Sequence, residues 1–343
     1  MTPAIAWVAV GSFVLSFVIT GAVRRLALKH GMIDVPNARS SHTEATPRGG
    51  GLAIFVSATL GIAALYCIGA ISKDVALAVC GSGGAVAIAG LIDDRRGLRP
   101  GVRLLVHFIA AGWAVGWLGG LPTVSIGGVA LQLGWLGDLL AVAAIVWTLN
   151  LFNFMDGIDG IAASEAVFIG ISAWWLSLRD TASAGIGSGL LAFVGACAGF
   201  LPWNWPTAKI FMGDVGSGYL GCALAVLALA AMREDPGALW VWLILGGVFF
   251  IDSTVTLVRR AIRGARIYEA HRSHAYQWLA RRWSSHLPVT LTVLGIDLFW
   301  LLPWAKLASV APRYSLAVLG IALVPLVAAA LVAGAGRAER PDQ

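Results

Sequence analysis

Residues 75–96 read VALAVCGSGGAVAIAGLIDDRR, an apolar run that ends in Asp93 and Asp94. Its uncharged part, residues 75–92, approaches the roughly 20 residues that an α-helix needs to cross a bilayer. A carboxylate at membrane depth is costly and normally faces a partner or a wet cavity. The stretch therefore predicts a membrane-spanning helix that carries two acids to a polar site.

Runs of the same kind recur along the chain, whose mean hydropathy is +0.81 and whose residues are 58% hydrophobic and 12% charged. This composition is typical of a polytopic membrane protein. We therefore predict an all-α integral membrane protein, a single transmembrane domain over residues 1–343 with about 11 helices, or about 10 if one short run is re-entrant. The other apolar runs are 3–23, 51–71, 104–119, 136–152, 160–178, 184–201, 215–232, 238–258, 287–305 and 314–334.

Arginine and lysine indicate the orientation. Alternating the loops between two sides puts 19 of the 24 basic residues on one side and 5 on the other, which is a strong positive-inside signal. The N-terminus is then outside and the C-terminus cytoplasmic. The net charge of +6 reflects loops that face anionic lipid and gives no reason to expect nucleic acid as a partner. The external loop TVSIGGVALQL at 123–133 predicts a small β-hairpin around Gly127-Gly128.

The motif NLFNFMDGIDG at 150–160 has the most specific pattern of polar residues. Its polar residues recur at every third position and would cover one helix face about 100° wide. They are Asn150, Asn153, Asp156 and Asp159. A polar loop with glycine turns is the alternative, but such loops seldom keep this period among leucine and phenylalanine. We predict that the motif forms part of a functional site.

Asp214 in IFMGDVGSG begins another apolar run. Aspartate caps helices well, so a structural cap is one interpretation. The neighbouring glycines leave amides open and a helix N-terminus favours phosphate, so binding is the other, and both can hold. For Asp93 and Asp94 the alternatives are a charged helix end and a pair of carboxylates that raise each other's pKa, so that one accepts a proton.

Two polar loops carry basic groups. The loop EAHRSHAYQ at 269–277 has His271, Arg272 and His274 within four residues, which suits anion recognition because arginine binds phosphate bidentately. A solvated basic loop is the alternative. The loop at 34–51 ends in TPRGGG and offers Arg48 beside glycines; phosphate contact and a plain connecting loop are equal alternatives there.

Acids grouped at the ends of apolar runs suit a hard divalent cation beside a phosphate. We therefore predict Mg²⁺, with Mn²⁺ as a substitute, and phosphate chemistry at a membrane surface. We also expect Asp252 to face the same cavity, Asp297 to have a deeper structural partner and His286 to lie at the membrane interface.

The ordered motifs resemble the polyprenyl-phosphate N-acetylhexosamine-1-phosphate transferases, bacterial glycosyl transferase family 4. The resemblance covers nearly the whole chain and rests on DVPN…TPRGGG, the DD pair, NxxNFMDGIDG, NWPTAKIFMGDVGSG and the final histidine loop. That loop reads HRSHAYQ, where the branch that makes peptidoglycan precursors has three consecutive histidines. The resemblance therefore points to the branch that initiates O-antigen or capsule chains in lipopolysaccharide and cell-envelope biosynthesis.

This resemblance implies that undecaprenyl phosphate attacks the β-phosphorus of a UDP-sugar, an N-acetylhexosamine or its 6-deoxy form, and that UMP leaves. It implies a bacterial inner (cytoplasmic) membrane protein with its site on the cytoplasmic face, and a homodimer stays open. A general-base role for Asp93 also stays open, because a phosphate monoester with a second pKa near ~6 is already largely ionised at neutral pH. We assign Asp93, Asp94, Asp156 and Asp159 to catalysis, Asn150, Asn153, Arg48, His271, Arg272 and His274 to substrate binding, and Asp214 to the metal.

A polytopic transporter with an acidic ion site is the alternative function. Such a protein would place its acids near the middle of the bilayer, whereas most acids here lie at the cytoplasmic ends of the runs. An intramembrane metalloprotease needs an HExxH pair, and the sequence has none.

Overall fold

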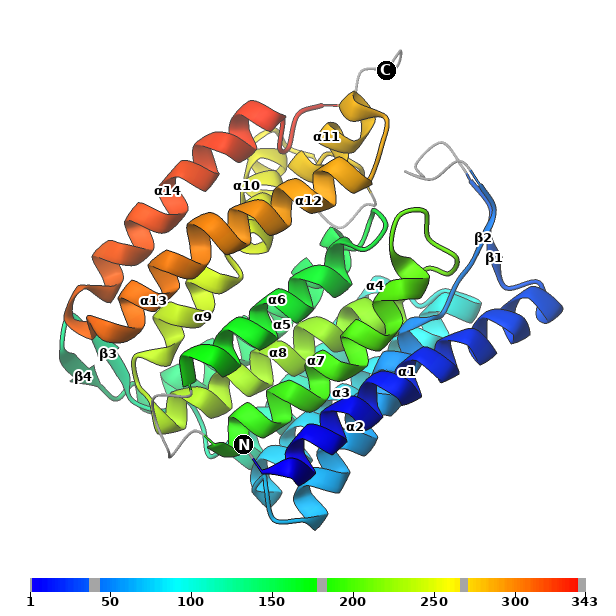
Figure 1. Cartoon of the computed structure of the whole chain (residues 1–343). Helices are drawn as coiled ribbons and strands as arrows, with labels where there is room; N and C mark the ends of the chain where they lie inside the picture. Colours follow the sequence, from blue (N-terminus) through cyan, green and yellow to red (C-terminus); the bar gives the residue numbers. More distant parts are fainter. Residues whose placement is uncertain (1, 37–43, 178–183, 266–270, 339–343) are drawn as a thin grey trace.

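The computed structural model describes residues 2–36, 44–177, 184–265 and 271–338; residues 37–43 of the 34–51 loop and Glu269 lie outside this description. The described chain is a bundle of helices (Figure 1). Its first half comprises α1 Pro3–His30, α2 Gly51–Cys67, α3 Lys73–Arg96, α4 Pro100–Leu118, α5 Gly134–Met155, α6 Ile161–Ser177 and α7 Ala184–Asn204. Its second half comprises α8 Asp214–Glu234, α9 Ala238–Leu245, α10 Gly247–Ile262, α11 Ala275–Trp283, α12 Leu287–Ile296, α13 Leu302–Val310 and α14 Ser315–Ala333.

Eight helical segments of the described chain are long and apolar enough to cross a membrane, and α9 with α10, bent by 71°, makes a ninth if the pair is one span. The apolar helices α2 and α6 have 17 residues each. Every apolar run predicted from the sequence falls on a helix or a pair of helices, so the all-α polytopic fold is confirmed. The number of crossings, the single domain and the direction of the termini stay predictions.

The outer surface of the bundle is apolar, whereas parts of its interior contain small polar side chains. Trp7 and Phe299 are 72% and 83% exposed, while α1 buries Ser12, Ser16 and Thr20. Large apolar side chains on the outside and small residues at helix contacts are the pattern of helices packed within lipid.

The contact between α1 and α7 depends on glycine. A Cβ atom at Gly195 or at Gly199 would overlap the carbonyl oxygen of Ala9 or of Phe13 on α1. The two glycines form a GxxxG pair, which lets helix backbones approach closely. This contact holds α1 beside α7 and fixes where α1 ends, next to the β1–β2 pair.

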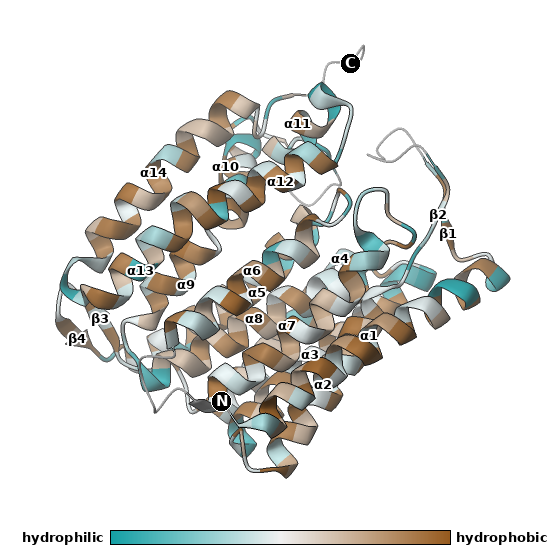
Figure 2. Ribbon diagram, in the orientation of Figure 1, coloured by the Kyte–Doolittle hydropathy of each residue, from teal (hydrophilic) through white to brown (hydrophobic). Residues whose placement is uncertain are grey.

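Hydrophilic residues gather at the two ends of the bundle (Figure 2). Two antiparallel pairs lie there: β1 Ile33–Asp34 with β2 Thr46–Pro47, and β3 Val124–Ile126 with β4 Val129–Leu131. The β3–β4 pair confirms the hairpin predicted near 123–133, and it lies at the far end of the bundle from β1–β2 (Figure 1). Its location outside the cell stays a prediction.

Both α3 and α5 pack against α8. Asp94 lies near the end of α3, Asp156 follows the last residue of α5 and Asp214 is the first residue of α8. Because α3 and α5 end where α8 begins, the topology brings acids from three distant segments to one end of the bundle. Arg48 follows β2 directly. Its backbone forms an isolated β-bridge with Phe211, which brings it to the same end of the bundle.

Candidate active site

Asp94 holds the start of α8. Its Oδ1 accepts a hydrogen bond from the amide of Asp214 at 3.0 Å, and its Oδ2 accepts one from the amide of Val215 at 3.2 Å. These amides are unsatisfied donors of a helix N-terminus, where a carboxylate also meets the positive end of the helix dipole. The side chain of Asp94 therefore caps α8, and the side chain of Asp214 is left to face the site.

The carboxylate of Asp214 joins side chains from three other segments. Its Oδ1 accepts from Arg48 Nη2 at 2.9 Å and from Asn153 Nδ2 at 3.2 Å, and its Oδ2 lies 3.6 Å from Arg103 Nη1. Arg48 Nη2 also lies 2.9 Å from Oδ1 of Asp94. The structure thus brings together Asp94, Asp214, Asn153 and Arg48, four residues predicted from the sequence.

Asp93 closes the turn between α3 and α4. Its Oδ1 accepts from the amide of Leu98 at 2.6 Å, and its Oδ2 accepts from Arg103 Nη1 at 3.0 Å. Because Arg103 is shared with Asp214, it links the two carboxylates. Sequence reasoning missed Arg103, which belongs to none of the motifs.

The TPRGGG loop (residues 46–51) is held by backbone hydrogen bonds to the segment before α8. The amide of Phe211 donates to the carbonyl of Pro47 at 2.8 Å, and the amide of Gly51 donates to the carbonyl of Met212 at 2.9 Å. A Cβ atom at Gly51 would overlap the Cα atom of Gly216. Glycine at both positions therefore allows the start of α2 to pack directly against the first turn of α8.

Asp156 lies where α5 ends, within electrostatic reach of Asp94 and Asp214. Burial is the main reason that the pKa of its carboxyl is raised well above the ordinary range; Arg48 opposes this effect, and Asp214 and Asp94 add to it. A cation bound beside such a carboxyl would stabilise its ionised form.

We call Asp93, Asp94, Asp156 and Asp214 the acidic cluster. Its four carboxylates meet two guanidinium groups, of Arg48 and Arg103, so two negative charges remain in excess when all four are ionised. Within the described chain, no group of three His, Cys, Asp or Glu residues is arranged as a metal site. Mg²⁺ is usually held by one or two carboxylates together with substrate phosphates, and the cluster fits that kind of binding.

Asn150 does not join the acidic cluster. Its Nδ2 donates to the carbonyl of Val146 at 2.7 Å and lies 3.4 Å from Nδ1 of His107. The regular spacing of the motif therefore does not put all its polar residues at one place, and a substrate contact at Asn150 stays a prediction.

Asp159 lies in a second site, a cavity of about 490 Å³ that we call the basic cavity. Arg272, Arg281 and His286 line it together with Asp159 and Phe211. The four predicted catalytic aspartates are thus divided: three lie in the acidic cluster with Asp214, and Asp159 lies in the basic cavity.

His286 sits against Asp159 inside the protein. Its Nδ1 lies 3.3 Å from Oδ2 of Asp159, whose Oδ2 also accepts from the amide of Ala208 at 3.0 Å. Thr290 on α12 donates to the carbonyl of Asp159 at 3.0 Å. The ring of His286 faces Asp159 in the wall of the basic cavity, and the location of His286 at the membrane interface stays a prediction.

The acidic cluster and the basic cavity are neighbours because the same three segments line both. Each segment contributes one residue to the wall of the basic cavity. A second residue, two or three positions away in the same segment, belongs to the acidic cluster or forms an ion pair with it. The pairs are Thr46 with Arg48, Asp159 with Asp156, and Phe211 with Asp214.

The final loop is anchored by Asp252. Its carboxylate accepts from the amides of Ala275 and Tyr276 at 2.8 and 3.0 Å, and it lies 3.4 Å from Nδ1 of His274. The Tyr276 hydroxyl donates to the carbonyl of Phe154 at 2.9 Å, next to the NFMDGID motif. Asp252 is buried and caps α11, so the expectation that it faces the cavity is wrong. His274 is only 2% exposed, and its contact with substrate stays a prediction.

His271 adds no positive charge to this loop. Burial, followed by the charges of His274 and Arg260, lowers the pKa of its imidazole to about 3. The ring is therefore neutral at physiological pH, and its Nδ1 lies 3.1 Å from the Ser273 hydroxyl. The loop's cation at the basic cavity is Arg272.

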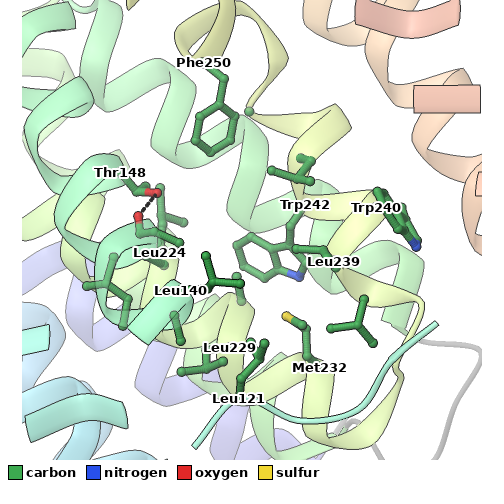
Figure 3. Close-up of a pocket in the computed structure, with 18 of the residues that line it drawn as sticks. Leu121, Leu140, Thr148, Leu224, Leu229, Met232, Leu239, Trp240, Trp242 and Phe250 are labelled. Carbon is green, nitrogen blue, oxygen red and sulfur yellow. Dashed lines mark hydrogen bonds between the residues drawn. The ribbon is translucent and has the colours of Figure 1, made fainter. Parts of the chain in front are cut away.

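Another cavity, of about 330 Å³, lies between α5, α8 and α9 near the β3–β4 hairpin (Figure 3). Leucines, Met232, Trp242 and Phe250 form its walls, and no acidic or basic side chain lines it. The hydroxyl of Thr148 is turned to the carbonyl of Ala144 at 2.8 Å. Such a cavity can hold hydrocarbon but cannot hold phosphate.

Comparison with known proteins gives consistent matches. The glycosyl transferase family 4 profile matches residues 75–232. A probable undecaprenyl-phosphate N-acetylglucosaminyl 1-phosphate transferase of Bacillus subtilis is 29% identical over 94% of this chain and 90% of its own length. The decaprenyl-phosphate N-acetylglucosaminephosphotransferase of Mycobacterium tuberculosis is 30% identical over 84% of this chain and 79% of its own length. A phospho-N-acetylmuramoyl-pentapeptide-transferase of Synechococcus is 35% identical over 53% of this chain and 54% of its own length.

Proposed function

Because this chain belongs to the polyprenyl-phosphate hexosamine-1-phosphate transferases of glycosyl transferase family 4, we propose that it transfers an N-acetylhexosamine 1-phosphate from a UDP-sugar to undecaprenyl phosphate. Membership of this family favours a transferase over the alternative function of a polytopic transporter. The observation that carries the proposal is the shared wall of the acidic cluster and the basic cavity. A nucleotide diphosphate bound across this wall would present its phosphates to Asp214.

The basic cavity suits the nucleotide. Its volume of about 490 Å³ lies within the range of small-molecule sites. Phe211 offers an aromatic ring for the base, and Arg272 offers a guanidinium for a phosphate. Phe211 lies three residues before Asp214, so a base beside the ring leaves the diphosphate within reach of the cluster.

In the proposed reaction an oxygen of the lipid phosphate attacks the β-phosphorus of the UDP-sugar. The bond from this phosphorus to the bridging oxygen breaks, and UMP leaves with that oxygen. Both reactants are anions, so their approach needs compensating charge. Arg48 and Arg103 are already paired with carboxylates of the acidic cluster, so this charge would come from a cation held there. Both oxygens of Asp93 accept hydrogen bonds, which supports a role in positioning Arg103 rather than in removing a proton.

A divalent cation, Mg²⁺ or Mn²⁺, would be held by Asp214 and Asp156 together with phosphate oxygens of the substrate. When bound, it neutralises charge on the diphosphate. The excess of carboxyl groups over guanidinium groups in the acidic cluster supports this assignment, because a bound cation would offset the burial that raises the pKa of Asp156.

The polyprenyl tail would occupy the apolar cavity of Figure 3. The cavity is lined by α5 and α8, and the same two helices carry Asn153 and Asp214 in the acidic cluster. A lipid that followed these helices would keep its hydrocarbon in an apolar environment and bring its phosphate to the site.

The donor is proposed to be UDP-N-acetylglucosamine or a 6-deoxy counterpart. Support comes from the relatives that align with most of this chain, whose names specify N-acetylglucosamine. The product would initiate a surface polysaccharide such as O-antigen, on the cytoplasmic face of a bacterial inner membrane.

A donor comparison tests this assignment. Purified protein, undecaprenyl phosphate and Mg²⁺ should release UMP from UDP-N-acetylglucosamine or its 6-deoxy analogue at least about tenfold faster than from UDP-N-acetylmuramoyl-pentapeptide, a factor of ten being roughly 1.4 kcal/mol of transition-state discrimination. Preference for the pentapeptide donor would instead assign the chain to the translocases. No UMP from any UDP-sugar would contradict the proposed function.

Arg272→Ala should raise the KM for the UDP-sugar by about 10–100-fold, because a hydrogen bond to a charged group contributes about 1.5–3 kcal/mol. The KM for undecaprenyl phosphate should change by less than about twofold if the cavity holds the nucleotide. Arg282→Ala is the matched control, since Arg282 is an exposed arginine on α11 that does not line the cavity. A rise confined to the lipid KM would assign Arg272 to lipid binding.

A further inference from the structure

The turn that follows α14 is buried inside the protein. The chain turns back from the end of α14 toward α11 (Figure 1), and Gly334, Ala335 and Gly336 are all buried. Ala335 is 0% exposed and packs against Ala275 of α11. Segments outside helices normally run over the surface, because their backbone groups need partners. We call residues 334–336 the strap, and its backbone groups find partners within the protein.

Two arginines of α10 bind the strap. Arg259 Nη1 donates to the carbonyl of Ala335, and Arg263 Nη2 donates to the carbonyl of Gly336. Hydrogen bonds from a charged donor are stronger than those between neutral groups. A carbonyl at the end of a helix or beyond it has no partner within that helix. The two guanidinium groups therefore fix the strap to α10.

The strap is also bonded to the final loop. The amide of Gly336 donates to the carbonyl of Ser273 at 2.7 Å, and Ser273 is 1% exposed. Ser273 directly follows Arg272, the cation of this loop at the basic cavity. The bond to the strap is therefore one residue away from a side chain that lines the cavity.

Glycine fits where the strap meets α10. A Cβ atom at Gly336 would lie 2.8 Å from the Cβ atom of Arg259 and 2.9 Å from the carbonyl oxygen of Thr256. The φ of Gly336 is +66°, a conformation that residues with a side chain rarely adopt. Thr256 also donates from its hydroxyl to Asp252 at 3.1 Å, and Asp252 caps α11. Two successive turns of α10 therefore hold both the strap and the final loop.

We propose that the strap positions Arg272 at the basic cavity. The strap holds the carbonyl of Ser273, next to Arg272, while Asp252 holds the amides of Ala275 and Tyr276 on the other side of Ser273. The described residues that line the cavity include none from the strap, so the strap acts by positioning and does not touch substrate. The role of Arg272 in binding the UDP-sugar rests on the proposed function, whereas the hold of the strap on the loop does not.

A purely structural role for the strap is the alternative. It would then fasten α14 to α10 and leave the final loop unaffected. Loss of such a fastening would lower the Tm of the protein without a selective effect on either substrate. Loss of positioning would instead raise the KM for the UDP-sugar and leave the KM for the lipid unchanged.

Hydrogen exchange in detergent tests the hold of the strap on the loop. A chain cut after Ala333 lacks the strap, whereas a chain cut after Ala338 keeps every contact described above. The peptide that contains Ser273, Ala275 and Tyr276 should exchange at least about tenfold faster in the shorter chain, because a segment that loses contacts opens more readily. Peptides from α3 should exchange equally in both chains. Equal exchange of the loop peptide would overturn the proposal.

A single substitution tests the link to the UDP-sugar. Gly336→Ala should dislodge the strap and raise the KM for the UDP-sugar about 3–10-fold, with the KM for undecaprenyl phosphate changed by less than about twofold. Gly69→Ala is the matched control. Gly69 follows α2 and has a φ of +71°, but nothing lies within 4 Å of an added Cβ atom there. Both KM values of this control should therefore stay at the wild-type level.

The double variant Gly336→Ala/Arg272→Ala separates positioning from general damage. If the strap acts through Arg272, Gly336→Ala should raise the KM for the UDP-sugar by less than about twofold once Arg272 is absent. A full additional rise, or a lower Tm with an unchanged KM for the UDP-sugar, would overturn the proposal. Failure of the proposed function would appear separately, as no turnover of the wild-type protein with any UDP-sugar, and the exchange experiment would still decide whether the strap holds the loop.

Discussion

Asp214→Asn should reduce turnover by at least about 10²–10³-fold, the size of effect seen when one preorganised electrostatic group is removed from an active site. The substitution is almost isosteric, but it removes the charge that pairs with Arg48 and that a hard cation requires. The start of α8 should remain folded, because the side chain of Asp94 caps it.

The measurement is UMP release per folded molecule, with folded protein quantified by size-exclusion chromatography in detergent. Asp74→Asn is a suitable control, because it removes one carboxylate from an exposed, 4.0 Å ion pair with Arg233. Normal turnover in Asp214→Asn would limit Asp214 to a structural role.

Removing divalent cations should abolish activity. EDTA should stop UMP release, and excess Mg²⁺ or Mn²⁺ should restore it, because the carboxylates of the acidic cluster outnumber its guanidinium groups and lie beside two anionic substrates. The same titration on the Asp214→Asn variant should show little recovery. Full wild-type turnover in EDTA would contradict a metal in this reaction.

The helices could be predicted from the sequence because membrane insertion requires long local apolar runs. The same runs predicted where acids such as Asp94 and Asp214 would emerge, and the structure brings these two together. The role of Asp94 as the cap of α8 could not be predicted, since a cap from another helix leaves no local pattern.

Two contacts of the site depend on segments that only the packing brings together. His286 and Asp159 are 127 residues apart, and Ala275 and Asp252 are 23 residues apart. No periodicity connects such positions, so neither contact could be predicted from the sequence.

The transfer of phosphate with the sugar is the central claim, and a UDP-sugar labelled with ³²P at its β-phosphate tests it most directly. With undecaprenyl phosphate and Mg²⁺, the label should move into the lipid as a diphosphate-linked sugar, and unlabelled UMP should appear in equal amount. Label that leaves in UDP, with the sugar on a lipid monophosphate, would contradict the account, because the acidic cluster would then serve glycosyl transfer rather than phosphoryl transfer.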